Sequence, residues 1–227
     1  MRIVLAAFFY LFALSITAKV VAQSDFSPQE QASLINSGIL GTNQVVFNEG
    51  RSAGDTISCS IVFTATFQDF ASNEGRLHIA NGNFTVFGQG DLPLVSMKLG
   101  ISRLTRELAS FVNPEFAYFE SSFGSSAKMN QDSGVSDPGY KVFIYLPDDP
   151  LFVEMFDSLL SSQKLKLYFN RHEDGLDQAI EIETDVVDIS VDPATSEFTR
   201  IRSDSAMGKF AVCALGVLSK MVDSSTP

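Results

Sequence analysis

The feature that most constrains the fold is a long alternation of apolar and polar residues in the first third of the chain. From residue 57 to residue 67 every odd position is apolar, and most even positions are Ser or Thr. Because successive side chains of a strand point to opposite faces, this segment is predicted to be a β-strand with one buried face. Cys59 belongs to the buried set, so we expect its side chain to point into the core.

Further strands are predicted by shorter segments of the same kind. They fall at 45–47, 76–80, 84–87, 95–101, 140–146 and 164–170, with turns predicted at 48–50, 81–83 and 88–91. Within 76–80 we expect Leu77 and Ile79 to point inward and His78 to point to solvent. Residues 179–191 are predicted to form one long strand with a bulge or bend near its middle.

Helices are predicted where caps precede apolar residues at helical spacing. Ser27 and Glu30 form a capping-box pattern around Pro28, which indicates a short helix near the start. A second helix is predicted at 150–160, with Asp148 or Asp149 as its cap and Pro150 at its first position. The last helix is predicted to begin near Ser205 and to carry an apolar stripe beside Cys213.

Two segments leave the local structure open. Residues 103–112 fit a helix or a strand, and residues 121–139, rich in Ser, Gly and Asp, are predicted to be a surface loop. The whole pattern predicts an α+β fold, mainly an antiparallel β-sheet or sandwich with two or three helices, one of them at the C-terminus.

The first 22 residues have the pattern of a cleaved secretory signal. A positive start at Arg2 precedes an apolar run from Ile3 to Ile16, and cleavage is expected after Ala22. The run falls short of the roughly 20 residues that cross a bilayer, although an uncleaved anchor is the alternative. We therefore expect residues 1–22 to be a signal peptide and residues 23–227 to be one β-rich domain, periplasmic or secreted, without a transmembrane span.

Export gives the two cysteines a structural interpretation. In an oxidising compartment, Cys59 and Cys213 are expected to form one disulfide, with two buried free thiols as the alternative. A catalytic Cys–His pair is disfavoured because neither cysteine has a neighbouring His or a motif that lowers its pKa.

Charge argues against a nucleic-acid partner. The chain has 16 Lys and Arg against 27 Asp and Glu, a formal net charge of −11. Phosphate contacts need clustered Lys and Arg, so this acidic balance argues against a nucleic-acid binder.

The chemistry-bearing residues indicate no metal, cofactor or catalytic site. His78 and His172 lack a zinc-binding spacing, and the acids at 174, 177, 185, 188 and 192 lack the EF-hand spacing. No G-x-S-x-G or S-x-x-K pattern with partner motifs is found. An enzyme is therefore less expected than a non-catalytic protein.

Aromatic residues offer the remaining functional signal. A possible partner surface is predicted from Phe87, Phe116, Tyr118, Phe119, Phe123, Phe143 and Tyr145. The alternative is that a second sheet or a helix covers them.

The plan of the chain generally resembles that of small exported bacterial envelope proteins. We expect a non-catalytic envelope or extracellular protein that binds another macromolecule, a protein or an envelope component. The alternatives are an exported hydrolase that uses acidic residues between 174 and 192, and a carrier of a small apolar ligand, which would need an enclosed Phe-lined cavity.

Overall fold

The structure, a computed structural model, describes most of the chain beyond the predicted signal peptide. The described residues are 25–71, 75–89, 92–106, 110–121, 124–125, 133–135, 137–145, 153, 156–157, 160–161, 164–171 and 175–224. The predicted signal peptide at 1–22 lies outside them.

Antiparallel strands dominate the described chain. The first strands are β1 (Gly41–Ser52), β2 (Asp55–Asp69), β3 (Arg76–Gln89) and β4 (Leu92–Arg103), followed by β5 (Phe116–Ser121), β6 (Gly124–Ser125), β7 (Ser133–Val135) and β8 (Lys141–Tyr145). The last are β9 (Lys164–Asn170), β10 (Gln178–Glu183), β11 (Val186–Val191) and β12 (Phe198–Arg202). Helix α1 (Pro28–Asn36) precedes the strands and helix α3 (Ser205–Ser224) follows them.

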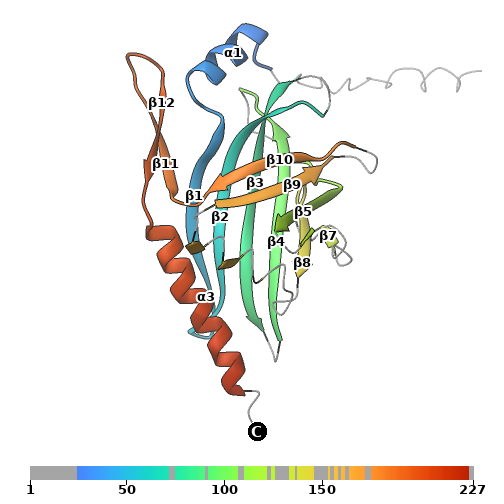
Figure 1. The fold of residues 1–227 in the computed structure, drawn as a ribbon, viewed down its shortest axis with the longest axis vertical. Coiled ribbons are helices and arrows are strands. Elements are labelled where there is room, and N and C mark those ends of the chain that lie inside the picture. Colours follow the sequence, from blue (N-terminus) through green and yellow to red (C-terminus); the bar gives the residue numbers. More distant parts are fainter. Residues whose placement is uncertain are drawn as a thin grey trace, which may run out of the picture.

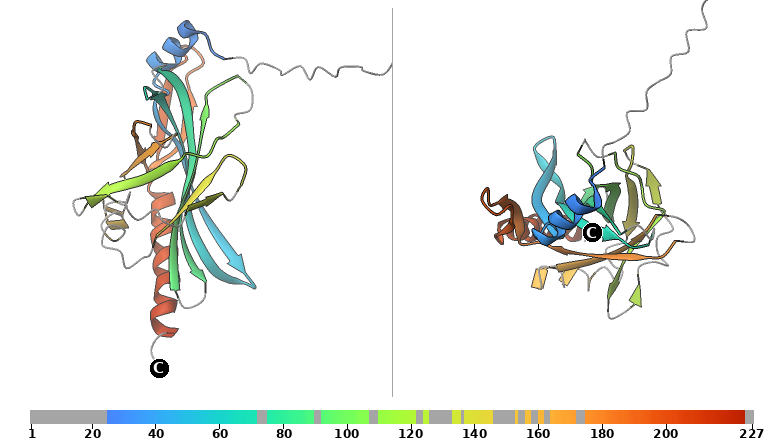
Figure 2. Two further views of the ribbon diagram at one scale, coloured as in Figure 1. Left: turned by 90° about the vertical axis from the view of Figure 1, so that its right-hand side faces the viewer. Right: turned by 90° about the horizontal axis from the view of Figure 1, so that it is seen from above.

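The strands form a large sheet, a smaller sheet and a hairpin. The large sheet has the order β1-β2-β3-β4-β8-β7, the smaller one has the order β10-β9-β5-β6, and β11 pairs with β12. In Figure 1 the strands β1 to β4 run along the molecule, and β9 and β10 cross in front of them at a steep angle. Helix α3 and the smaller sheet lie on the same side of the large sheet (Figure 2). This arrangement confirms the predicted α+β, sandwich-like class.

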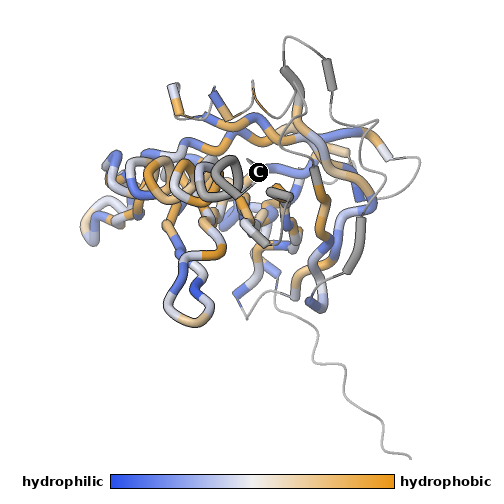
Figure 3. Tube along the Cα trace, turned by 90° about the horizontal axis from the view of Figure 1, so that it is seen from below, coloured by the Kyte–Doolittle hydropathy of each residue, from blue (hydrophilic) through white to orange (hydrophobic). Residues whose placement is uncertain are grey.

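One hydrophobic core fills the space between the large sheet and its two covers. The odd positions of β2 from Cys59 to Phe67 point into it, as the alternation predicted. The smaller sheet contributes Phe169, and α3 contributes Phe210, whose ring meets that of Phe84 edge-on at 6.1 Å. Hydrophobic and hydrophilic residues alternate along the strands (Figure 3). Burial of these apolar side chains supplies the main driving force for the fold.

Helix α1 begins as its sequence predicted. The Glu30 backbone N–H donates to Ser27 Oγ at 3.3 Å, and the Ser27 N–H donates to Glu30 Oε2 at 2.8 Å. This reciprocal capping box satisfies two donors that a helix start otherwise leaves unpaired.

Two predicted turns are wrong because glycine has another use in these strands. β1 continues through 48–50, and the chain turns at Ala53 and Gly54, which have φ of 52° and 92°. β3 continues through 81–83. A Cβ on Gly82 would lie 2.8 Å from the Phe63 ring and closer still to the Lys98 carbonyl oxygen, so this glycine permits close packing within the sheet.

The inward parity predicted for β3 is also wrong. Val86 lies opposite Cys59, so the even-numbered residues of β3 share the core face, and His78 is only 1% exposed. Leu77 is buried as well, on the opposite face, where its N–H donates to Gln31 of α1 at 3.1 Å. Both faces are covered at this end of β3, so alternation could not show which face meets the core.

Three other segments differ from their predictions or are only partly described. Residues 179–191 form two strands in different sheets, β10 and β11, with a turn at Thr184 and Asp185. The described part of 103–112 is neither a helix nor a strand beyond the end of β4, and 121–139 contains β6 and β7. Within the predicted helix at 150–160, residues 153, 156, 157 and 160 are helical and the others lie outside the described residues.

Candidate functional site

Five of the seven aromatic residues predicted as a partner surface have described side chains, and these five lie in different places. Phe119 and Phe143 are buried in the core, at 2% and 1% exposed. Phe116 and Tyr118 alternate with the core residues Ala117 and Phe119, so they lie on the other face of the smaller sheet, where Tyr118 is itself only 8% exposed. There the Tyr118 ring stacks on Tyr168 with centroids 5.1 Å apart.

The remaining members of that set lie elsewhere. Phe87 is half-buried on the face of the large sheet opposite the core, and Phe123 and the side chain of Tyr145 lie outside the described residues. The five described members therefore do not share one face of the molecule.

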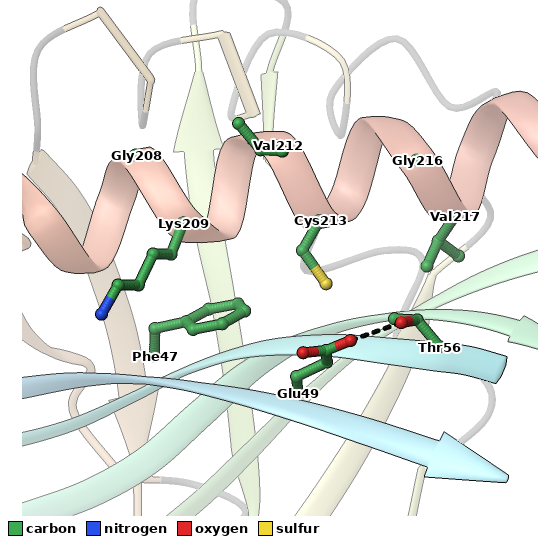
Figure 4. Close-up of a pocket in the computed structure, with 9 residues that line it drawn as sticks. All are labelled: Phe47, Glu49, Thr56, Gly208, Lys209, Val212, Cys213, Gly216 and Val217. Atoms are coloured by element: carbon green, nitrogen blue, oxygen red, sulfur yellow. Dashed lines mark hydrogen bonds between the residues drawn. The ribbon is translucent and has the colours of Figure 1, made fainter. Parts of the chain in front are cut away.

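A hydrophobic groove lies between α3 and the β1–β2 hairpin. It has a volume of about 630 Å³. Figure 4 shows its lining, with the helix above the two strands: Phe47, Glu49, Thr56, Gly208, Lys209, Val212, Cys213, Gly216 and Val217. Val212 is 75% exposed on the helix, so an apolar side chain rims the groove and faces solvent.

The disulfide fixes α3 above this groove. The predicted Cys59–Cys213 bridge is present, and it joins β2 to α3 across 154 residues of sequence. Phe210, Ala214 and Val217 anchor the inner face of the helix in the core. On its exposed face, a Cβ added to Gly208 or Gly216 would meet no atom within 4 Å.

The floor of the groove includes an edge strand. β1 pairs with β2, and in the described structure no other strand pairs with the outer edge of β1. Near its start this edge is covered by Arg200, which donates to the carbonyl oxygens of Gly38 and Thr42 at 3.3 Å and 3.0 Å. From Phe47 onward the edge runs beside the groove. Backbone groups at such an edge can pair with an added strand.

One carboxylate lines the groove and is held by its neighbours. The Arg51 guanidinium donates to Glu49 at 3.0 Å and 3.1 Å, and the Thr56 hydroxyl also donates to Glu49. These hydrogen bonds, first from Arg51 and then from Thr56, lower the pKa of Glu49, so it is anionic at neutral pH.

A buried polar cluster joins the two sheets at the far end of the core. Arg171 Nη1 donates to Asp69 Oδ2 at 2.9 Å and lies 3.1 Å from His78 Nε2. The Gln178 side-chain amide donates to Asp69 Oδ1. The Asp69 side chain is fully buried, so the guanidinium and the amide compensate its lost hydration.

The contacts of His78 fix its protonation state. Its Nδ1 lies 3.0 Å from the Arg76 carbonyl oxygen, which can only accept, so Nδ1 carries the proton and Nε2 accepts from Arg171. Burial lowers the pKa of His78; the Arg76 carbonyl and Asp69 oppose this effect, and the cations Arg171 and Arg103 add to it. A neutral imidazole with both nitrogens bonded serves the packing of the two sheets. The prediction that His78 is solvated is therefore wrong.

The acids considered for calcium binding or hydrolysis have separate partners. Asp185 accepts from Arg202 at 2.7 Å, Asp188 from the Ile189 N–H and Asp192 from the Ala194 N–H. Asp174 and His172 lie outside the described residues. Among the described residues, no group of three or more His, Cys, Asp or Glu is placed to hold a metal ion.

Two other acids share a cleft but are both ion-paired. Glu181 and Glu183 line a hollow of about 450 Å³ beside β2. Lys164 pairs with Glu181 at 2.6 Å, and Arg202 pairs with Glu183 at 3.0 Å. Glycoside hydrolysis needs one carboxyl group as a proton donor, whereas these two carboxylates are each held by a cation.

One feature of the α3 sequence indicated the groove, although the prediction for this helix rested only on its buried apolar stripe. An amphipathic helix on a protein surface normally carries charged residues opposite its buried stripe. Here the opposite face reads Gly208, Val212, Leu215 and Gly216, with Lys209 as the charged residue among them. Uncharged residues on the exposed face were the observable sign of a second contact surface.

Comparisons with models of known protein families, with curated proteins and with solved structures return no match. None of the helices in the described part of the chain combines the length and apolar character that a membrane crossing requires.

Proposed function

We propose that this chain is an exported, non-catalytic protein that binds an extended segment of another protein in the groove between β1 and α3. The observation that carries the proposal is the edge of β1 beside an apolar groove, an edge with which no other described strand pairs. An edge strand offers backbone hydrogen bonds, and the groove offers burial for side chains, which together are the two requirements of recognition by strand addition.

The geometry of the groove favours an extended occupant over a helix or a globular surface. A strand that adds to β1 would place alternate side chains toward α3, where Phe47, Val212 and Val217 present apolar surface. The open spaces over Gly208 and Gly216 leave room for those side chains. We therefore expect the bound segment to carry apolar residues at alternate positions.

The remaining properties of the chain are compatible with this role outside the cytoplasm. An intramolecular disulfide is typical of oxidising compartments, which supports a periplasmic or secreted location. The net charge of −11 disfavours nucleic acid as the partner. The core is filled by large side chains such as Phe63, Phe169 and Phe210, which favours a surface groove over an internal carrier cavity.

Selection of random peptides displayed on phage against the oxidised protein would test the proposal. Selected peptides would be measured by fluorescence anisotropy against Val212→Asp and Gly216→Leu, which charge and fill the groove. Ser219→Leu adds the same side chain to α3 outside the groove, and Val191→Asp makes the same change on β11, so these are the matched controls.

We expect the two groove variants to weaken binding about tenfold or more, because interface energy concentrates in a few buried contacts. The two control variants should bind like the unmodified protein. Equal binding to all four variants would refute the groove as the binding site. If no peptide is selected but decanoate binds, and the two groove variants weaken that binding, the result would instead favour a carrier of small apolar ligands.

A further inference from the structure

A second hollow lies where the end of β2 meets the start of β10. It has a volume of about 290 Å³ and is lined by Gln68, Phe70, Ala71, Leu176, Asp177, Gln178 and Ala179. Phe70 is 65% exposed and Leu176 is 73% exposed. Single exposed apolar residues are ordinary, but here two from distant parts of the chain converge on one cleft, which suggests that the cleft binds an apolar group.

The cleft also carries the exposed carboxylate of Asp177. Asp177 accepts hydrogen bonds from the Tyr118 hydroxyl at 2.6 Å and from the Asn170 side-chain amide at 3.1 Å. Both donors are neutral, and within the described residues Asp177 forms no ion pair, whereas the nearby Asp69 is paired with Arg171. The two hydrogen bonds orient the carboxylate of Asp177 without neutralising it.

Two amide oxygens near the cleft lack hydrogen-bond donors. The amide nitrogens of Asn170 and Gln178 donate to the carboxylates of Asp177 and Asp69, which fixes the amide orientations and leaves each carbonyl oxygen as an acceptor. Among the described residues neither oxygen has a hydrogen-bond partner. Both residues line an adjoining cavity of about 50 Å³, and Gln178 also lines the cleft itself. Buried acceptors without donors favour a ligand that supplies N–H groups.

We propose that this cleft binds a primary alkylammonium ion, with its amine at Asp177 and its alkyl chain between Phe70 and Leu176. A primary ammonium group brings three donors and one positive charge, which match one carboxylate and neighbouring acceptors. A quaternary ammonium ion has no donor, and a carboxylate ligand would be repelled by Asp177. The proposal uses a surface separate from the β1–α3 groove.

NMR titration of the protein with n-hexylammonium tests this assignment directly. The backbone amides of Leu176, Asp177 and Gln178 should shift in a saturable manner. Hexan-1-ol, which has the same chain without the charge, should bind about tenfold more weakly, and hexanoate should cause no shift. Added salt should weaken the binding of hexylammonium and leave that of hexanol unchanged.

Variants separate the charge from the apolar contact. Asp177→Asn should weaken binding of hexylammonium about tenfold and leave hexanol unchanged, whereas Leu176→Ala should weaken both. Asp188→Asn on β11 is the matched control and should have no effect, and Gly216→Leu in the groove should have none either.

Equal affinity for hexylammonium and hexanol, an absence of saturable shifts, or full binding by Asp177→Asn would overturn the proposal. If Asp177→Asn does not fold, the comparison of the three probes and the salt dependence on the unmodified protein decide the outcome. Gly216→Leu changes the β1–α3 groove and not this cleft. Loss of the alkylammonium proposal can therefore be distinguished from loss of the proposed peptide-binding function.

Discussion

Removal of the disulfide should destabilise this protein strongly, because the bridge closes most of the chain into a loop. Cys59 and Cys213 are separated by 154 residues. In the loop-entropy account, a bridge across that length reduces the conformational entropy of the unfolded chain and so raises the free energy of the unfolded state by roughly 5 kcal/mol. Measured effects of disulfides on stability are typically about 2–4 kcal/mol. We therefore expect Cys59→Ala/Cys213→Ala to lower the free energy of unfolding by about 3–5 kcal/mol.

Urea denaturation followed by circular dichroism measures this loss. The oxidised protein is compared with the same protein in reductant and with the double variant, and reductant should not affect the double variant. The inner face of α3 keeps its apolar contacts in the double variant, so we expect a folded protein with a lower midpoint. A loss below about 1 kcal/mol would refute the view that the bridge restricts the unfolded chain substantially.

The buried polar cluster gives two further predictions. Because burial holds the pKa of His78 below its ordinary value of 6.5, the unfolded chain takes up a proton first as the pH falls. The free energy of unfolding should therefore decrease as the pH drops from 6.5 through the native pKa, and His78→Gln should flatten urea midpoints over that range. Arg171→Met should cost about 3 kcal/mol in urea denaturation because it leaves Asp69 buried without its guanidinium. Arg51→Met, which breaks an exposed ion pair with Glu49, should lower the urea midpoint much less than Arg171→Met, and equal losses would contradict this reasoning.

The sequence predicted those parts of the fold in which one strand face or one helix stripe was buried. β2 kept its alternation because its odd positions meet the core over the whole strand, and this placed Cys59 correctly. α3 and its bridge to β2 followed from the position of Cys213 beside the apolar stripe.

The sequence misled where both faces of an element are covered or where glycine serves packing. His78 and Leu77 are both buried, so the polarity of these side chains did not indicate which face of β3 packs against the core. Gly82 resembles a turn residue but provides space for the Phe63 ring inside a sheet. Predicting the β1–α3 groove would have required knowing which strand forms the edge of the large sheet. The order in which strands pair is a long-range property that local sequence patterns do not contain.

Hydrogen exchange at β1 tests the central claim most directly. A peptide that adds as a strand must form hydrogen bonds with the outward-facing amides of β1, so alternate amides between Phe47 and Gly50 should exchange more slowly in the complex. Their neighbours already pair with β2 and should change less. Protection confined to α3, or unchanged exchange throughout β1 with the groove saturated, would contradict recognition by strand addition.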